Sequence, residues 1–194
     1  MRAVGNRWRS FEYTLVSAGP CAVAVDLPTV GMAQMFADCL VMRVDVEPGD
    51  CPLTAEAVRA IRYLCLVSEA DHIVIAGTPN WTTRGSRFTS GARPLDVLTH
   101  IADTLDVLAD LSEQLGEYGE RVHLMPFGWN LAWRAEKSAR QWDLPSITVS
   151  ASGDIEVVPA SIRRLSGPSV PCSSTARPSG PARTFRSVSC ARGN

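Results

Sequence analysis

The sequence predicts a single α/β domain in which two main helices pack on one side of a mixed β-sheet. Strand-like apolar runs alternate with two segments of helical periodicity, and further strand-like runs follow the second helix. The hydrophobic content of 45% is ordinary for a domain with a sizeable core. Composition changes near the C-terminus, so we expect a folded domain over residues 1–165 and a disordered tail rich in Ser, Pro and Arg over residues 166–194.

The expected strands are short runs rich in β-branched and aromatic residues. They cover residues 11–16, 39–46, 73–76, 122–125, 129–135, 147–150 and 155–158. The second run is closed by a turn at Pro48, Gly49 and Asp50. Residues 27–35 contain both Pro and Gly, and they predict a loop or a poorly formed helix.

Two helices are expected between these strands. The first is predicted to start after an N-cap at Thr54. Its apolar face consists of Val58, Ile61, Leu64 and Cys65. The second is predicted to run from Pro94, a favourable first-turn residue, to about Gly116. The stripe that we expect to pack on the sheet consists of Leu98, Ile101, Leu105 and Leu108.

The segment from Gly167 onward is rich in Ser, Pro and Gly, and it carries Arg177, Arg183, Arg186 and Arg192 without any acidic residue. Such a composition cannot bury enough apolar surface to offset the entropy of ordering. The tail is either a basic arm that contacts RNA phosphates or a solvated extension. The composition favours the solvated extension.

Charge and cysteine usage restrict the class of protein. A formal net charge of -1 gives no general attraction to nucleic acid, so any contact with RNA has to be local. The cysteines are Cys21, Cys39, Cys51, Cys65, Cys172 and Cys190. None forms a CxxC pair, which predicts reduced cytoplasmic thiols, no metal site and no cofactor. No apolar run approaches the roughly 18 residues of a membrane span, so we expect no membrane contact.

Common catalytic motifs are absent from the sequence. There is no P-loop, GxGxxG, HExxH or GxSxG pattern, so no catalytic residue can be assigned. We expect His72, His100 and His123 to be surface or boundary residues rather than catalytic bases.

Residues 122–133 read VHLMPFGWNLAW, a strand-like run rich in aromatic residues. In one interpretation Phe127, Trp129 and Trp133 pack in a core, and Gly128 marks a bulge or a close approach of two backbones. In the other, the same strand lines a binding site. Both can hold for one strand, because alternate residues face opposite sides of a sheet.

Four segments, SFEYTLV, VMRVDVEPGDCP, HIVIAGTPNWTT and VHLMPFGWNLAW, occur in an order and spacing that indicate a family. Together they resemble the N-terminal editing domain of archaeal threonyl-tRNA synthetases over residues 10–133. PFGW is the most specific of the four. The resemblance implies a D-aminoacyl-tRNA deacylase-like fold. It also implies that the PFGW strand lines a pocket for the terminal adenosine and the esterified amino acid of a charged tRNA.

The residues that the resemblance implies for substrate binding are Glu12, Tyr13, Asn80, Trp81, Phe127, Gly128, Trp129, Asn130 and Leu131. The chain departs from the family pattern at three of them. Asn80 stands where the family has His, and Asn130 and Leu131 stand where it has Tyr and Lys. Neither Asn nor Leu titrates, so the family's acid–base roles at these positions are not carried over.

The resemblance implies a stand-alone protein that hydrolyses or binds mischarged aminoacyl-tRNA, with seryl-tRNA as the expected substrate. The alternative is a catalytically degenerate module that binds adenosine or aminoacyl-tRNA or acts in regulation, and a third reading is a purely structural dimerisation relic. The implied partners are the aminoacyl-tRNA 3′ end, a second copy of the chain in a homodimer, and a threonyl-tRNA synthetase acting in trans.

Overall fold

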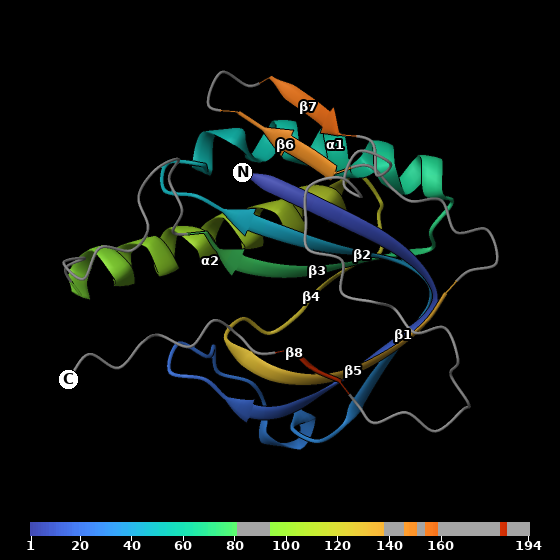
Figure 1. The fold of residues 1–194 in the computed structure, drawn as a ribbon, viewed down its shortest axis with the longest axis vertical. Helices are drawn as coiled ribbons and strands as arrows, with labels where there is room; N and C mark the ends of the chain where they lie inside the picture. The colour runs from blue at the N-terminus through green and yellow to red at the C-terminus, as the bar shows by residue number, and fades with distance from the viewer. Residues whose placement is uncertain (81–93, 138–145, 151–153, 159–182, 186–194) are drawn as a thin grey trace, which may run out of the picture.

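A computed structural model describes residues 1–80, 94–137, 146–150, 154–158 and 183–185 (Figure 1). The strands are β1 (Arg2–Ala18), β2 (Ala33–Val46), β3 (His72–Pro79), β4 (Val122–Leu124), β5 (Trp129–Lys137), β6 (Ser146–Val149), β7 (Ile155–Val158) and β8 (Arg183–Phe185). The helices are α1 (Thr54–Ser68) and α2 (Pro94–Glu117), with short 3-10 turns η1 (Leu27–Thr29) and η2 (Cys51–Leu53). This content confirms a mixed α/β fold.

All the described strands belong to one mixed sheet. Six of them follow the order β4-β3-β2-β1-β5-β8; off this path, β6 pairs with β1, and β7 pairs with β6. The pairs β2–β3 and β3–β4 are parallel, whereas β1 is antiparallel to its neighbours. One edge of β1 pairs with β2 along most of its length. The other edge pairs with β6 near the start of β1 and with β5 near its end, so β1 connects the two halves of the sheet.

The sheet bends where β1 and β2 share a local irregularity. Trp8 pairs with Cys39 and Ser10 pairs with Ala37, while Asp38 between them has a positive φ of 41°. At the same place, between Trp8 and Ser10, the register of β1 shifts against β5, and a bulge of this kind increases the local twist and redirects the strand. The sheet therefore curls, and β5 and β8 lie across from β2 and β3 (Figure 1). We call the inner face of this curl the concave face.

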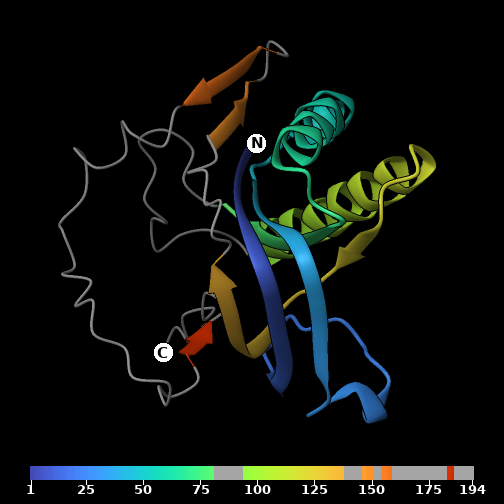
Figure 2. The same ribbon diagram turned by 90° about the vertical axis from the view of Figure 1, so that its right-hand side faces the viewer.

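Both α-helices lie on the opposite, convex face of the sheet (Figure 2). The connections β2–α1–β3 and β3–α2–β4 each join neighbouring parallel strands, so crossovers of the same hand place both helices on one side. Their shared core with the sheet includes Leu40, Met42, Ile61, Ile75 and Leu111. The prediction of two main helices on one side is confirmed.

Helix α1 agrees with the prediction except at its start. Val58, Ile61, Leu64 and Cys65 are all buried, as expected. The predicted N-cap at Thr54 is wrong, because the helix begins at Thr54 and the capping position is Leu53. The Thr54 hydroxyl donates to the carbonyl oxygen of Cys51 at 2.9 Å, so it closes the preceding η2 turn.

The predicted stripe of α2 is partly wrong. Ile101 and Leu108 are buried and Leu105 is half-buried, but Leu98 is 61% exposed. The buried face is rotated and consists of His100, Ile101, Thr104, Val107, Leu108, Leu111 and Leu115. Thr104 can face the sheet because its hydroxyl donates to the carbonyl oxygen of His100 within the helix, which satisfies a buried polar group.

Strands β1 and β2 are longer than predicted. Early in β1 the buried residues, Ala3 and Gly5, are small, and Arg2 and Asn6 on the concave face are polar and exposed. A search for apolar residues therefore does not detect this part of the strand. Residues 27–35, expected to be a loop or poor helix, contain η1 and the start of β2. Of the predicted tail, the structure describes only Arg183–Phe185, which pair with β5. The remaining tail residues lie outside the described ranges, so disorder there stays a prediction.

Candidate functional site

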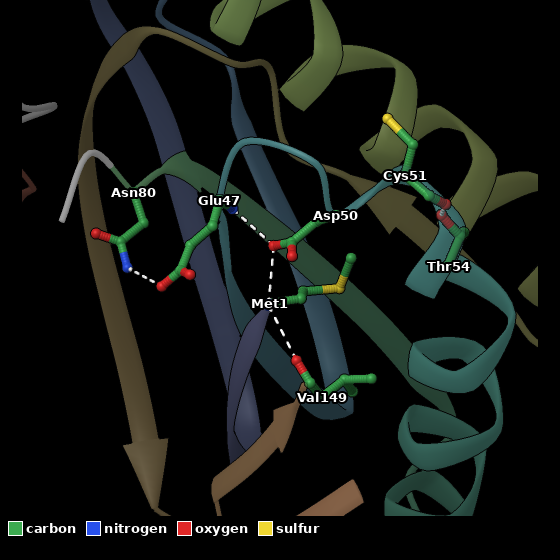
Figure 3. A network of polar contacts seen from close by, with 7 residues as sticks. All are labelled: Met1, Glu47, Asp50, Cys51, Thr54, Asn80 and Val149. Carbon is green, nitrogen blue, oxygen red and sulfur yellow. Dashed lines mark hydrogen bonds and ion pairs between the residues drawn. The ribbon is translucent and has the colours of Figure 1, made fainter. Parts of the chain in front are cut away.

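The parallel strands β2 and β3 end side by side, and polar residues follow both ends. Ligands of α/β proteins often bind beyond the carboxyl ends of such strands. The Asn80 backbone N–H donates to the carbonyl oxygen of Val46 at 2.6 Å. Its side-chain Nδ2 donates to Glu47 Oε1 at 3.1 Å (Figure 3). Asn80 therefore fastens the end of β3 to the turn after β2.

Asp50 closes that turn, since its backbone N–H donates to the carbonyl oxygen of Glu47, and its side chain is buried. Its Oδ2 accepts the backbone N–H of Glu47 at 2.7 Å and lies 2.8 Å from the Met1 α-ammonium (Figure 3). The same ammonium donates to the carbonyl oxygen of Val149 at 3.1 Å. These contacts fix the turn that holds Asn80.

His100 reaches the same region from α2. The imidazole is buried, and burial lowers its pKa. Backbone hydrogen bonds at Asn80 and Val46 and the charges of Asp103 and Asp50 act in the opposite direction, but the lowering by burial is larger. It is therefore neutral at pH 7. The prediction of a surface or boundary histidine is wrong for His100, because its side chain is only 3% exposed on the buried face of α2.

The concave face holds a second polar pair among aromatic rings. The Tyr13 hydroxyl lies 2.7 Å from His123 Nε2, and the Phe36 ring packs 4.7 Å from the His123 ring centroid. Burial raises the pKa of Tyr13 to about 12 and lowers the pKa of His123. Both groups are thus neutral at pH 7, and in the Nδ1-protonated tautomer His123 accepts the tyrosine O–H.

The Pro-Phe-Gly-Trp turn before β5 packs tightly against another segment. Gly128 has a φ of 79°, and a Cβ there would lie 2.5 Å from the carbonyl oxygen of Cys21. The Gly128 carbonyl accepts the N–H of Gly19, and the Phe127 carbonyl accepts the N–H of Val23, each at 3.0 Å. The interpretation of this glycine as a close backbone approach is confirmed.

The odd-numbered residues of β5 lie on the concave face. Leu131 is 8% exposed and pairs with Leu15, and Trp133 belongs to the same apolar cluster. Trp129 also packs there, and its indole Nε1 donates to the carbonyl oxygen of Val23 at 2.9 Å. The position where the resemblance implies Lys is therefore a buried apolar one in this chain.

Other predicted site residues lie elsewhere. Glu12 pairs with Met35 and Arg134 on the convex face, opposite to Tyr13. Asn130 Nδ2 donates to Ser17 Oγ at 2.9 Å on the face of β5 opposite to Leu131.

Phe127 packs against the helix-side core. Asn80 lies beyond one end of β1 and Asn130 lies beside the other. Trp81 lies outside the described residues, so the predicted meeting of the two asparagines around one substrate stays a prediction.

The concave face is partly closed to a ligand. Tyr13, Leu15 and Leu131 are buried in it, and the Tyr13 hydroxyl is already bonded to His123. It offers a ligand the half-buried rings of Trp8, Trp129 and Trp133 for stacking. Sequence reasoning missed His123 and His100. His123 could have been found by pairing it with Tyr13 across the sheet, but that requires the strand order.

A hollow of about 340 Å³ also lies on the helix side, lined by Cys51, Thr54, Asp106, Val107, Ala109, Asp110 and Glu113. Burial, and then the charge of Asp103, raise the pKa of Cys51, so this thiol is protonated at pH 7 and a poor nucleophile. The carboxylates of Asp106, Asp110 and Glu113 line this hollow and repel a phosphate-bearing ligand. The concave face is therefore the better candidate for a nucleotide.

Within the described ranges, no three His, Cys, Asp or Glu side chains are placed to hold a metal ion. No described helix combines the length and the apolarity needed to cross a membrane. No protein-family model and no curated protein matches the chain.

Proposed function

We propose that the chain binds the aminoacylated 3′ adenosine of tRNA on the concave face and hydrolyses the ester of mischarged, seryl-bearing tRNA. The proposal rests on the resemblance of four sequence segments to the editing domain of threonyl-tRNA synthetases. One observation supports it: these segments fall on β1, the end of β2, β3 and the β4–β5 turn, which are neighbours in one curled sheet.

Hydrolysis in such a site has to work without a titrating group at position 80 or 131. Positioned backbone N–H groups can stabilise the developing oxyanion, and the neighbouring ribose hydroxyl of the substrate can assist attack. The Tyr13 hydroxyl and His123 Nε2 bond to each other and Tyr13 is 2% exposed, so this pair is not assigned an acid–base role. General acid–base assistance is worth about a hundredfold to ten-thousandfold, so turnover without it is expected to be slow.

A second candidate is a binding or regulatory module that does not hydrolyse its ligand. The observation that favours it is Leu131, which fills the concave apolar cluster where the resemblance implies Lys. Under either candidate we propose a homodimer, with a threonyl-tRNA synthetase acting in trans as a further partner. The purely structural reading predicts no ligand on this face.

Two measurements separate these candidates. Calorimetric titration with a non-hydrolysable seryl-adenosine analogue tests binding, and a deacylation time course on seryl-tRNA bearing the threonine anticodon tests hydrolysis. Trp133→Leu is expected to weaken binding of the analogue, since it removes a concave aromatic ring. The control Tyr63→Leu, at a residue 61% exposed on α1, is expected to leave binding unchanged.

Binding with turnover supports the hydrolase, and binding without turnover supports the module. Absence of both contradicts the proposal. Circular dichroism checks that each variant is folded.

A further inference from the structure

The concave face extends beyond the aromatic cluster along the first half of β1. Ala3 and Met1 join the helix-side core, so the alternate residues Arg2, Asn6 and Trp8 face the other way. Arg2 and Asn6 are exposed and Trp8 is half-buried. Both helices lie on the convex face, so neither α1 nor α2 lies over this face of β1 (Figure 1).

Cationic residues from neighbouring strands lie beside this row. Arg43 of β2 pairs with Val4, and Lys137 of β5 pairs with Trp8, which puts both cations on the concave face. The nearest acid, Asp45, accepts a hydrogen bond from Thr78 Oγ1 at 2.5 Å and one from Arg43 Nη2 at 3.2 Å. These contacts engage the Asp45 carboxylate and orient the Arg43 guanidinium.

The charge of the molecule is unevenly distributed. Helix α2 has no basic residue, and its acidic residues are Asp96, Asp103, Asp106, Asp110, Glu113 and Glu117. The concave face carries Arg2, Arg43 and Lys137 against Asp45 and, at the β6–β7 hairpin, Glu156. Of the charges placed here, three cations against two acids leave the concave face with a net charge of +1, whereas α2 carries six carboxylates and no Lys or Arg.

Aromatic rings adjoin the cations. The rings of Trp8 and Trp133 lie 6.5 Å apart at an interplanar angle of 56°, and both residues are half-buried. Proteins that bind single-stranded nucleic acid combine such stacking surfaces with a cationic track for the backbone. From Arg2 to Trp8 the strand extends about 20 Å at 3.3 Å per residue, which suits a strand of a few nucleotides.

We infer that this row is a binding surface for single-stranded RNA, with phosphates on Arg2, Arg43 and Lys137 and bases stacked on Trp8 and Trp133. The inference rests on the proposed function, because it assigns the nucleotides that precede the terminal adenosine. The charge complementarity and the paired indoles favour a nucleic acid over an acidic peptide, which needs no stacking surface.

The test is fluorescence anisotropy of the full chain with a labelled single-stranded RNA octamer that ends in CCA, titrated at several salt concentrations. The log–log salt slope is expected to fall by about 0.7 for each phosphate contact removed, in Arg2→Gln and in Arg43→Gln. The control Arg59→Gln removes an equal charge from α1, where the side chain is 65% exposed, and is expected to leave the slope unchanged.

Trp133→Leu is expected to weaken RNA binding by about 5- to 150-fold, the range for one stacked base. The inference is overturned if the octamer does not bind, if Arg59→Gln lowers the slope as much as Arg43→Gln, or if a duplex of the same sequence binds equally well. Both arginine variants are at exposed positions, where a substitution does not disturb the core. The salt slopes of these two variants therefore test the inference even if Trp133→Leu does not fold.

The experiments distinguish a failure of the proposed function from a failure of the proposed RNA-binding surface. If the seryl-adenosine analogue binds but the octamer does not bind, or binds no better than the duplex of the same sequence, the RNA surface is wrong and the proposed function stands. If the octamer binds through Arg43 and the analogue does not bind, the proposed function is wrong and the RNA surface stands.

Discussion

Gly128 shows how one residue sets the position of a whole segment. Its positive φ and its close approach to Cys21 both exclude a side chain. A non-glycine residue in the left-handed region costs about 1–3 kcal/mol. Gly128→Ala is expected to lower the free energy of unfolding by more than this, because the added methyl group also collides with the backbone of Cys21. The control Gly119→Ala shares the positive φ, 83°, but would meet no atom within 4 Å. Equal losses in urea denaturation would contradict the packing argument.

Leu131 is the residue at which packing and the resemblance disagree. Leu131→Lys would place an ammonium in an apolar cluster, and we expect it to lower the free energy of unfolding by at least about 1 kcal/mol relative to Leu131→Met. Under the hydrolytic candidate the same variant is also expected to raise deacylation per folded molecule. Thermal melts and deacylation rates of both variants check the two expectations, and a Lys variant as stable as the Met variant refutes the first.

His100 and His123 make stability depend on pH. Burial lowers the pKa of both histidines in the folded chain. In the unfolded chain a histidine has a pKa of about 6.5, so below this pH the unfolded chain binds more protons than the folded chain. The free energy of unfolding is therefore expected to be constant just above pH 7 and to fall as the pH drops below about 6.5. Denaturant titrations at pH 7.5 and 5.5 measure this loss. His123→Gln is expected to reduce it, and an unchanged loss would argue against a neutral His123.

At the scale of elements, the face of α2 is the clearest test of packing. Leu111 is fully buried against the sheet, whereas Leu98 is 61% exposed. Leu111→Ala is expected to cost about 2–5 kcal/mol of stability, and Leu98→Ala less than about 0.5 kcal/mol. Urea denaturation compares the two, and a larger cost at Leu98 would restore the stripe that the sequence predicts.

The existence and order of the helices and of most strands could be predicted, because their apolar residues recur at helical or strand spacing. The rotation of α2 could not, since Thr104 and His100 are buried through contacts that a search for apolar residues does not see. The first part of β1 was hidden for the opposite reason. Its polar residues Arg2 and Asn6 are exposed on the concave face.

At the scale of the whole molecule, the curl of the sheet decides which candidate residues meet. Tyr13, Trp129 and Leu131 share the concave face because β5 pairs with the end of β1. Glu12 and Asn130 are their sequence neighbours but face outward. Sequence alternation predicts that neighbours face opposite ways, but the strand order that brings β1 beside β5 depends on long-range pairing, which the local pattern does not contain.

The central claim is that the concave face binds an aminoacyl-adenosine, and amide and indole chemical-shift mapping with the non-hydrolysable seryl-adenosine analogue tests it most directly. The account predicts saturable shifts at Tyr13 and at the indole N–H signals of Trp129 and Trp133, with α1 unaffected. Shifts confined to α1 and α2, or no shift at millimolar analogue, would contradict it.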